Sequence, residues 1–199
     1  MILETIVSTL NDEGQVNFAP MGVVVESMES EFVEIRPFKE TVTFQNLQAT
    51  ESAVVHLVDD ANLICKLALN LPVDEIEFEP ANEIAGQVMQ QACQAWEVQV
   101  QFADTLSERA SFNCRIRHRH HLKPFSGLNR AAMALIEATI LATRLDFIPL
   151  QFVREKLSDL EAAVSKTGSP QHLATFQQVC EFVDSHSGNA VNRSEAGRQ

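Results

Sequence analysis

The pattern of apolar and polar residues in the N-terminal third of the chain predicts β-strands. Residues 2–10 are rich in Ile, Leu and Val, and residues 11–14 (Asn-Asp-Glu-Gly) have the composition of a turn. Further strands are expected at residues 15–26, 31–35 and 53–58. Residues 41–47 fit either a strand or a short helix. This part of the chain therefore has β character.

Two longer alternating segments follow in the middle of the chain. The apolar side chains of Trp96, Val98, Val100 and Phe102 alternate with the polar side chains of Glu97, Gln99 and Gln101. Residues 109–121 alternate in the same way, so the two segments predict a pair of half-buried strands joined by a turn at residues 104–107. An irregular acidic excursion is expected before them, at about residues 71–94.

From residue 129 onward the pattern changes to that of helices. Residues 129–145 contain neither Gly nor Pro, which predicts a helix with Ser126 or Asn129 as its N-cap. Further helices are expected at residues 61–69 (capped by Asp59-Asp60), 150–166 and 170–185. Strands first and helices last, with a late strand pair between them, indicate an α+β fold rather than an alternating α/β fold.

The chain length of 199 residues suits one large domain or two small ones, each with its own core. We expect a first domain over residues 1–125 and a C-terminal helical section over residues 126–186 that packs on it. Residues 187–199 are polar and are expected to form a disordered tail.

The composition restricts the partners and the compartment. The net charge of −12 disfavours binding to nucleic acid or to an anionic membrane, because phosphate groups require a positive surface. No apolar stretch is long enough to cross a bilayer, and no basic segment followed by an apolar run suggests a secretory signal. The four cysteines (Cys65, Cys93, Cys114 and Cys180) are scattered, which favours reduced thiols in the cytoplasm over disulfides or a zinc site.

The second expected strand is interrupted at residues 17–22 (Asn-Phe-Ala-Pro-Met-Gly). Pro20 has no N–H for a strand ladder, and Gly22 has no side chain to pack. One interpretation is an edge strand with a bulge, which this segment alone favours. The other is a platform on which a flat, hydrogen-bonding ligand lies against the backbone.

The common catalytic motifs are absent from the sequence. It contains no GxGxxG, Walker, HExxH or GxSxG motif, and it contains no Tyr. If the protein is an enzyme, a cofactor therefore supplies its reactive group.

A first group of candidate binding residues comprises Arg36, Thr41, Thr43 and Asn46. A cationic side chain, two hydroxyls and an amide form a credible site for a phosphate and a ribityl chain. The alternative is a turn in which the Thr and Asn side chains cap the backbone, and these residues taken alone favour it.

The run of residues 115–121 (Arg-Ile-Arg-His-Arg-His-His) is the densest basic feature of the chain. The preferred interpretation is a solvated strand face that discourages edge pairing or contacts the acidic segment 74–83. An anion-binding strip is the second interpretation, and a metal site is the third. The anion-binding interpretation rests on Arg117 and Arg119. Residues 129–145 offer a similar choice, because Asn129 and Arg130 at the helix start fit an anion, whereas the helix body fits packing.

Together these segments resemble the flavin-binding split-barrel proteins. The resemblance lies in residues 4–9 (ETIVST), Gly14, residues 17–22 (NFAPMG), residues 36–38 (RPF), Thr41, Thr43, Asn46 and Leu47. With residues 125–131 (FSGLNRA) and 142–145 (ATRL), the chain is similar to an uncharacterised flavin-binding family. That family occurs in methanogenic archaea and in bacteria with tetrahydromethanopterin-linked one-carbon metabolism.

The resemblance implies a six-stranded antiparallel split barrel with a C-terminal helical section, FMN as the cofactor, and a homodimer with FMN near its interface. It places the FMN phosphate and ribityl chain at Arg36, Phe38, Thr41 and Thr43. It places the isoalloxazine ring along Asn17, Ala19, Pro20, Met21 and Gly22. Further FMN contacts are expected from Thr9, Asn46, Leu47 and His56.

The resulting hypothesis is an FMN-dependent oxidoreductase with an unidentified small-molecule substrate or electron donor. The alternative is a flavin-binding or assembly protein that uses the same fold without turnover. The long helical section departs from the flavin reductases of this fold, which puts a simple NAD(P)H:flavin reductase activity in doubt. A metal-dependent enzyme using His118, His120 and His121 is a third, less favoured class.

Overall fold

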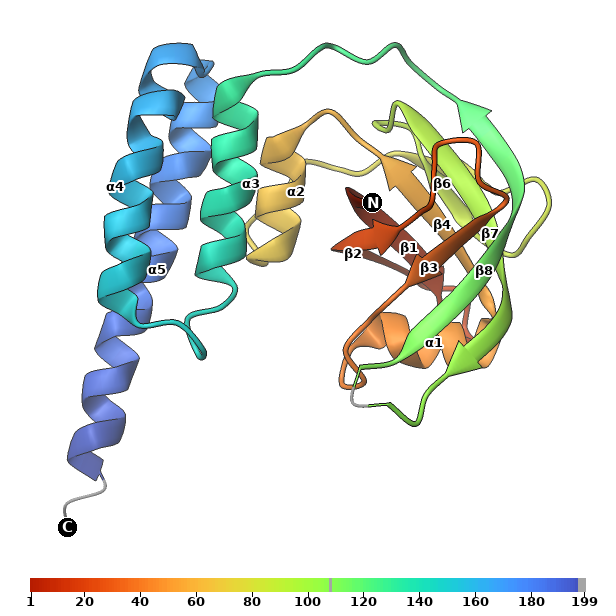
Figure 1. Ribbon diagram of the computed structural model, residues 1–199, viewed down its shortest axis with the longest axis horizontal. Coiled ribbons are helices and arrows are strands. Elements are labelled where there is room, and N and C mark those ends of the chain that lie inside the picture. The colour runs from red at the N-terminus through yellow and green to blue at the C-terminus, as the bar shows by residue number, and fades with distance from the viewer. Residues whose placement is uncertain (108, 197–199) are drawn as a thin grey trace. The chain divides into compact units, whose positions relative to one another are not determined.

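Six antiparallel strands form a closed barrel, as expected from the family resemblance. The computed structural model describes residues 1–107 and 109–196, with side chains described as far as residue 186. The barrel strands are β1 (Ile2–Leu10), β2 (Val16–Val24), β3 (Phe32–Ile35), β4 (Ser52–Leu57), β7 (Gln94–Asp104) and β8 (Ser111–His121). Their order around the barrel is β1-β2-β3-β8-β7-β4, and β4 pairs again with β1 (Figure 1). The α+β expectation is confirmed.

Apolar side chains fill the barrel interior. Trp96, Phe112, Val23 and Ile35 are among the fully buried residues of this core. The ambiguous segment after β3 forms the helix α1 (Val42–Thr50), which contacts β1, β2 and β4. Thr41 is its N-cap and accepts a hydrogen bond from the N–H of Phe44, which explains why a helix forms here rather than a strand.

The acidic excursion contains a hairpin that the sequence did not predict. Strands β5 (Phe78–Pro80) and β6 (Gln87–Met89) pair with each other. Residues 74–83 are largely exposed, as expected, but Val88 and Met89 are buried. Val88 packs with Val54 of β4 and Ala95 of β7, so the hairpin covers part of the outer barrel wall.

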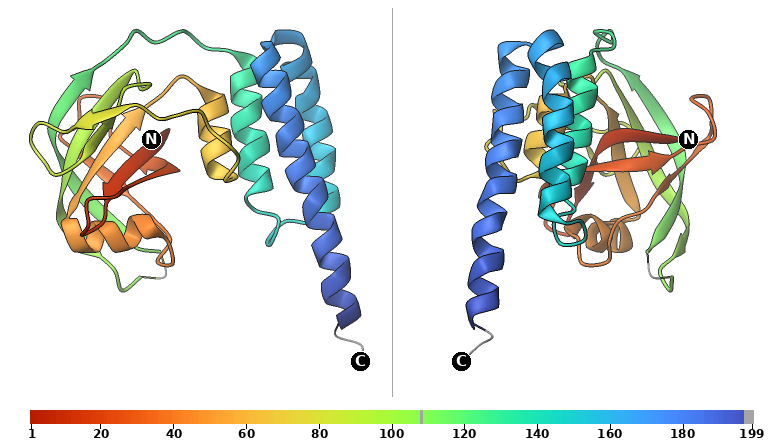
Figure 2. Two further views of the ribbon diagram at one scale, coloured as in Figure 1. Left: turned by 180° about the vertical axis from the view of Figure 1, so that it is seen from behind. Right: turned by 60° about the vertical axis from the view of Figure 1, so that its left-hand side comes forward.

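The remaining helices form a second unit. They are α2 (Ala61–Ala68), α3 (Arg130–Ala142), α4 (Leu150–Thr167) and α5 (Pro170–Ala196), and the last three lie side by side (Figure 2). Asn129, one of the two expected N-caps, accepts from the N–H groups of Ala131 and Ala132. None of the described helices is long and apolar enough to span a bilayer.

The structure differs from the expected domain organisation in two respects. Residues 60–73 belong to the helical unit, because Cys65 of α2 is buried with Leu135 of α3 in its core. The barrel unit therefore comprises residues 1–59 and 74–126. The expected disordered tail is helical as far as Ala196, since α5 continues beyond residue 187, while residues 197–199 lie outside the described residues.

Candidate functional site

Strand β2 has a backbone edge that no neighbouring strand of the structure uses. On one side, all nine residues from Val16 to Val24 pair with β1. On the other side, only Val23 and Val24 pair with β3. Residues 16–22 therefore present unpaired backbone groups, and these residues include the interrupted segment that the sequence singled out. The expected edge strand is confirmed for this segment, and its pairing with β1 shows no bulge.

The register identifies which residues face the open edge. Met1 and Val25 exchange two hydrogen bonds, from the N-terminal ammonium to Val25 O (2.6 Å) and from Val25 N to Met1 O (3.0 Å). Because bonded and non-bonded pairs alternate along an antiparallel ladder, Val16, Phe18, Pro20 and Gly22 direct their backbone groups away from β1. Pro20 fits this position, because its missing N–H costs no ladder bond there. The edge thus offers N–H donors at Val16, Phe18 and Gly22 and carbonyl acceptors at all four residues.

A neutral polar cluster joins β2 and β1 to helix α1. The side-chain amide of Asn17 donates to the Oγ1 of Thr43 (3.2 Å). The side-chain amide of Asn46 donates to the Oγ1 of Thr9 (3.0 Å), and both of these residues are buried. The structure therefore brings together four of the predicted FMN-binding residues on three elements. Thr41 lies at the start of the same helix, where its hydroxyl donates to Phe38 O (2.7 Å).

Three other predicted FMN contacts belong to the barrel wall or its core. Leu47 is fully buried among the core residues, and Met21 packs against the same core. Met21 also accepts, at its carbonyl, a hydrogen bond from the Thr5 hydroxyl (2.9 Å). Ala19 is paired with Val7 on the β1 side of β2. These residues shape the wall beneath the open edge.

The missing side chain of Gly22 makes room for a residue of β1. A Cβ atom added to Gly22 would lie 2.7 Å from the Cγ2 atom of Ile2, which is closer than side chains pack. The close approach predicted at this glycine is therefore made by Ile2, itself 64% exposed.

The loop after β3 is braced by an exposed ion pair and a stacked guanidinium. Arg36 lies 2.6 Å from Glu34, and its hydrogen bond is the main reason that the pKa of Glu34 is lowered, with a further bond from Ser111. Arg109 donates to Arg36 O (3.0 Å) and lies over the ring of Phe38 (5.0 Å). Phe38 is 62% exposed, so its other face is open to a ligand.

His56 has a structural environment that differs from the expected ligand contact. Its Nδ1 lies 3.0 Å from Ile6 O, and its Nε2 accepts from the N–H of Met89 (3.0 Å). This pattern requires a neutral ring with the proton on Nδ1. Burial lowers the pKa of His56 to about 4, which keeps the ring neutral. Both ring nitrogens are used, so His56 supports the β6 hairpin.

The predicted anion-binding residues are divided between the two units, with Arg117 and Arg119 in the barrel unit and Asn129 and Arg130 in the helical unit. Arg119 donates to the carbonyls of Met28 (2.9 Å) and Ser30 (2.6 Å), and its guanidinium lies over the ring of Trp96 (4.5 Å). Arg117 is exposed on β8. Asn129 uses its side chain to cap α3 and to donate to Thr167 O (3.1 Å), and it belongs with the exposed Arg130 to the helical unit. The solvated-face interpretation fits Arg117, whereas Arg119 packs against the buried Trp96.

Sequence reasoning missed a buried charged cluster around Glu97. Alternation placed Glu97 on a polar face, but it is fully buried because the excursion covers it. Its carboxylate accepts from the N–H groups of Asn82 and Glu83 (both 2.7 Å) and lies 2.6 Å from His120 Nε2. Burial opposes ionisation, but these hydrogen bonds outweigh it and lower the pKa of Glu97. His118 lies against His120 and 3.4 Å from the Asn82 amide.

A second carboxylate that sequence reasoning missed is that of Asp59, which follows β4 and interacts with residues that follow β8. Asp59 accepts from the backbone N–H (2.8 Å) and the hydroxyl of Ser126, and Lys123 lies 3.0 Å from it. Although burial opposes this, the bonds from Ser126 and Lys123 lower the pKa of Asp59. The sequence signal was an Asp-Asp pair, of which Asp60 caps α2 as expected. Among the described residues, no group of three or more His, Cys, Asp or Glu is arranged to hold a metal ion.

Comparison with known protein families identifies the chain. Residues 3–123 match the family model described as the N-terminal domain of "Protein of unknown function (DUF447)". Residues 129–181 match the second model of that family, described as "Protein of unknown function (DUF447)". The chain belongs to the DUF447 family. This confirms the uncharacterised family that the sequence resembled. A comparison with curated proteins found no match.

Solved structures of low sequence identity share the fold. An FMN-bound DUF447 protein from Methanosarcina mazei has a TM-score of 0.76 at 22% identity, over 91% of this chain and 94% of that chain. The NADH:FAD oxidoreductase of Streptomyces globisporus has a TM-score of 0.52 at 14% identity, over 61% of this chain and 76% of the other. An FMN-binding protein from Thermus thermophilus has a TM-score of 0.50 at 13% identity, over 60% and 70% of the two chains. Of these three matches, the one to the DUF447 protein covers the largest share of this chain.

Proposed function

We propose that this protein binds FMN at the open edge of β2 and the start of α1, and that bound FMN carries hydride or electron transfer. The observation that carries this proposal is the unpaired edge of residues 16–22 beside the Asn17–Thr43 cluster. The DUF447 relative from Methanosarcina mazei, which is FMN-bound, supports the choice of cofactor.

The backbone of β2 suits a flat heterocycle. The edge presents both N–H donors and carbonyl acceptors, and the pyrimidine part of a flavin ring needs both. Pro20 and Gly22 carry no long side chain that would hold a ring away from this edge. The backbone groups and the Asn17 side chain therefore orient the ring, while the flavin itself supplies the redox chemistry.

The start of α1 suits a phosphate group. The first N–H groups of a helix have no partners within it and carry a partial positive charge. Arg36 and Lys39 precede this helix start, and Thr41 caps it. A phosphate here would interact with helix N–H groups, with Lys39, and with Arg36, whose charge Glu34 partly neutralises.

The assignment includes a homodimer in a reducing compartment. A strand edge left open to solvent invites pairing with another chain, and a second subunit would cover it together with the flavin. The four cysteines are free, which suits the cytoplasm. A link to tetrahydromethanopterin-type one-carbon metabolism belongs to the same proposal and rests on the family resemblance.

The decisive experiment is the absorption spectrum of the purified protein. We expect flavin bands at close to one FMN per chain, either as isolated or after incubation with FMN. A colourless protein that takes up no FMN would contradict the proposal. Anaerobic addition of NADH or NADPH then tests the redox role: bleaching of the bound flavin supports an oxidoreductase. Bound flavin that no donor reduces and no acceptor reoxidises would favour the non-catalytic binding function.

A further inference from the structure

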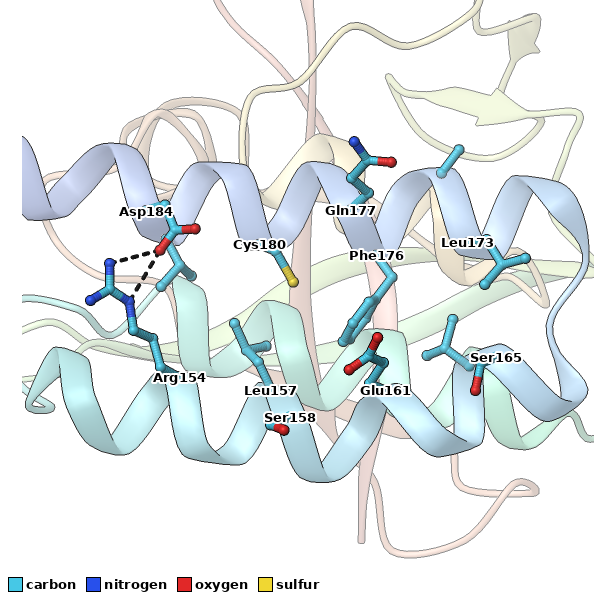
Figure 3. A pocket seen from close by; sticks show the side chains of 13 residues that line it. Arg154, Leu157, Ser158, Glu161, Ser165, Leu173, Phe176, Gln177, Cys180 and Asp184 are labelled. Atoms are coloured by element: carbon cyan, nitrogen blue, oxygen red, sulfur yellow. Dashed lines mark hydrogen bonds and ion pairs between the residues drawn. The ribbon is translucent and has the colours of Figure 1, made fainter.

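A groove lies between α4 and α5 in the helical unit. Both helices pack on α3, and the space left between them has a volume of about 800 Å³ (Figure 3). Buried apolar side chains form its floor, namely Leu157, Val164, Phe176 and Val183. Leu173 at one end is 45% exposed, so an apolar surface continues from the floor to the solvent.

The spacing of the lining residues fits a helix. On α4 the groove is lined at positions 154, 157, 158, 161, 164 and 165, and on α5 at positions 173, 174, 176, 177, 180, 183 and 184. Steps of three and four residues are those of helices that accept the side chains of a third helix between them. The lined part of α4 is about 17 Å long, or three helical turns. An added helix would extend the packed helices of this unit by one, against α4 and α5.

The charges around the groove are mostly negative. Burial and the carboxylates of Asp184, Glu161 and Glu181 raise the pKa of the Cys180 thiol, which points into the groove (Figure 3). Arg154 closes one end through bonds from Nε (3.1 Å) and Nη2 (2.7 Å) to Asp184. Among the lining residues, one cation, Arg154, stands against the carboxylates of Glu161 and Asp184, and Glu181 adds a third carboxylate near Cys180. This excess of negative charge favours a positively charged occupant.

We propose that the groove between α4 and α5 binds an amphipathic helix of a partner protein, with apolar residues on one face and Lys or Arg along its edges. Apolar side chains at positions i, i+4 and i+7 of this helix contact the floor. Its cations contact Glu161 and Glu181. A second copy fits the groove less well, because a symmetric pair would bring two acidic grooves together in a chain of net charge −12.

The test uses the full-length protein and two synthetic helical peptides of four turns. Both carry Leu at positions i, i+4 and i+7, and the remaining positions carry Lys and Ala in one peptide and Glu and Ala in the other. We expect the Lys peptide to bind at 1:1 stoichiometry and at least about tenfold more tightly than the Glu peptide. Alkylation of Cys180 by iodoacetamide reports occupancy independently, because bound peptide slows it; Cys65, Cys93 and Cys114 are buried.

Matched variants separate groove binding from general attraction to an acidic protein. Glu161→Lys changes a groove residue, whereas Glu155→Lys makes the same charge change at an exposed position of α4 outside the groove. We expect Glu161→Lys to lower the affinity for the Lys peptide about tenfold. Glu155→Lys should lower this affinity about twofold or less. Leu173→Ala removes an exposed apolar contact, so it should lower the affinity for the Lys peptide about tenfold without unfolding the protein.

Three results would overturn the proposal. The first is no binding of the Lys peptide, and the second is equal weakening by the two charge variants. The third is that, without peptide, Cys180 alkylation slows as the protein concentration rises and that Leu173→Ala abolishes this slowing. Such a result would identify a second copy as the occupant. The flavin content of the protein is measured alongside, and neither the presence nor the absence of FMN changes these outcomes.

Discussion

Two polar clusters of the barrel unit differ in charge: the one around Glu97 is charged, and the one around Asn17 and Thr43 is neutral. The carboxylate of Glu97 is fully buried, and two backbone N–H groups and His120 use its acceptor sites. The Asn17–Thr43 pair is neutral and lies beside an unpaired strand edge. A buried charge must be fully paired, because an unpaired one is costly, whereas amides and hydroxyls can keep unused hydrogen-bonding capacity. We therefore assign the charged cluster to stability and the neutral cluster to binding.

Removing the buried carboxylate should have the largest effect on stability. Glu97→Ala leaves the N–H groups of Asn82 and Glu83 without their acceptor, and we expect the free energy of unfolding to fall by about 3 kcal/mol. Urea denaturation measures this loss. Glu79→Ala, at an exposed position of the same excursion, is the control and should change stability by less than about 0.5 kcal/mol. Similar losses in both variants would refute the structural role of Glu97.

The stability of the barrel should also fall in mild acid because of His56. Its pKa is about 4 in the folded protein against an ordinary value of 6.5, so below pH 6.5 the unfolded chain binds a proton that the folded chain does not. The stabilisation present above pH 6.5 is lost as the pH falls toward 4, by about 3 kcal/mol in total. Urea denaturation between pH 7 and pH 4.5 tests this window. The pKa of Glu97 is lowered, so its own contribution disappears only at lower pH.

The control for this pH dependence is His56→Gln, which keeps a donor and an acceptor but does not titrate. We expect its stability to vary less with pH between 6.5 and 4.5 than that of the wild type. An unchanged slope would show that other groups cause the acid sensitivity.

The neutral cluster should respond in affinity rather than in stability. Asn17→Ala removes the amide that bonds Thr43 beside the proposed FMN site, and we expect FMN to bind about tenfold more weakly. The free energy of unfolding should fall by less than about 1 kcal/mol, because Asn17 is only half-buried. Fluorescence titration with FMN and urea denaturation give the two values. The control Asn113→Ala, on the exposed face of β8, should change neither the FMN affinity nor the free energy of unfolding. A large stability loss in Asn17→Ala would contradict the assignment of the neutral cluster to binding.

The smallest effect is expected at the exposed ion pair of Arg36 and Glu34. Arg36→Ala should change stability by less than about 0.5 kcal/mol, since solvent screens this pair. If Arg36 contacts the FMN phosphate, the variant should bind FMN a few-fold more weakly, and added salt should reduce this difference. An affinity that matches the wild type at low salt would remove Arg36 from the site.

Much of the fold followed from local patterns. The hydrophobic run at residues 2–10 corresponds to β1, and the capping signal at Asn129 marks the start of α3. The hairpin of β5 and β6 was not predicted, because its strands have three residues each and no clear alternation. Glu97 was placed on the wrong kind of face for a related reason. Strand alternation tells which residues share a face, but not whether another segment covers that face.

The sequence by itself determined the family, the α+β class and the position of the interrupted strand at residues 17–22, because these depend on residue type and spacing. Only the tertiary structure decided which backbone groups of this strand are open. That depends on β3 pairing with Val23 and Val24 alone. Contacts between distant residues, such as Asn17 with Thr43 and His56 with Met89, likewise arise from chain folding. These contacts separate the residues that can meet a ligand from those already engaged in holding the barrel together.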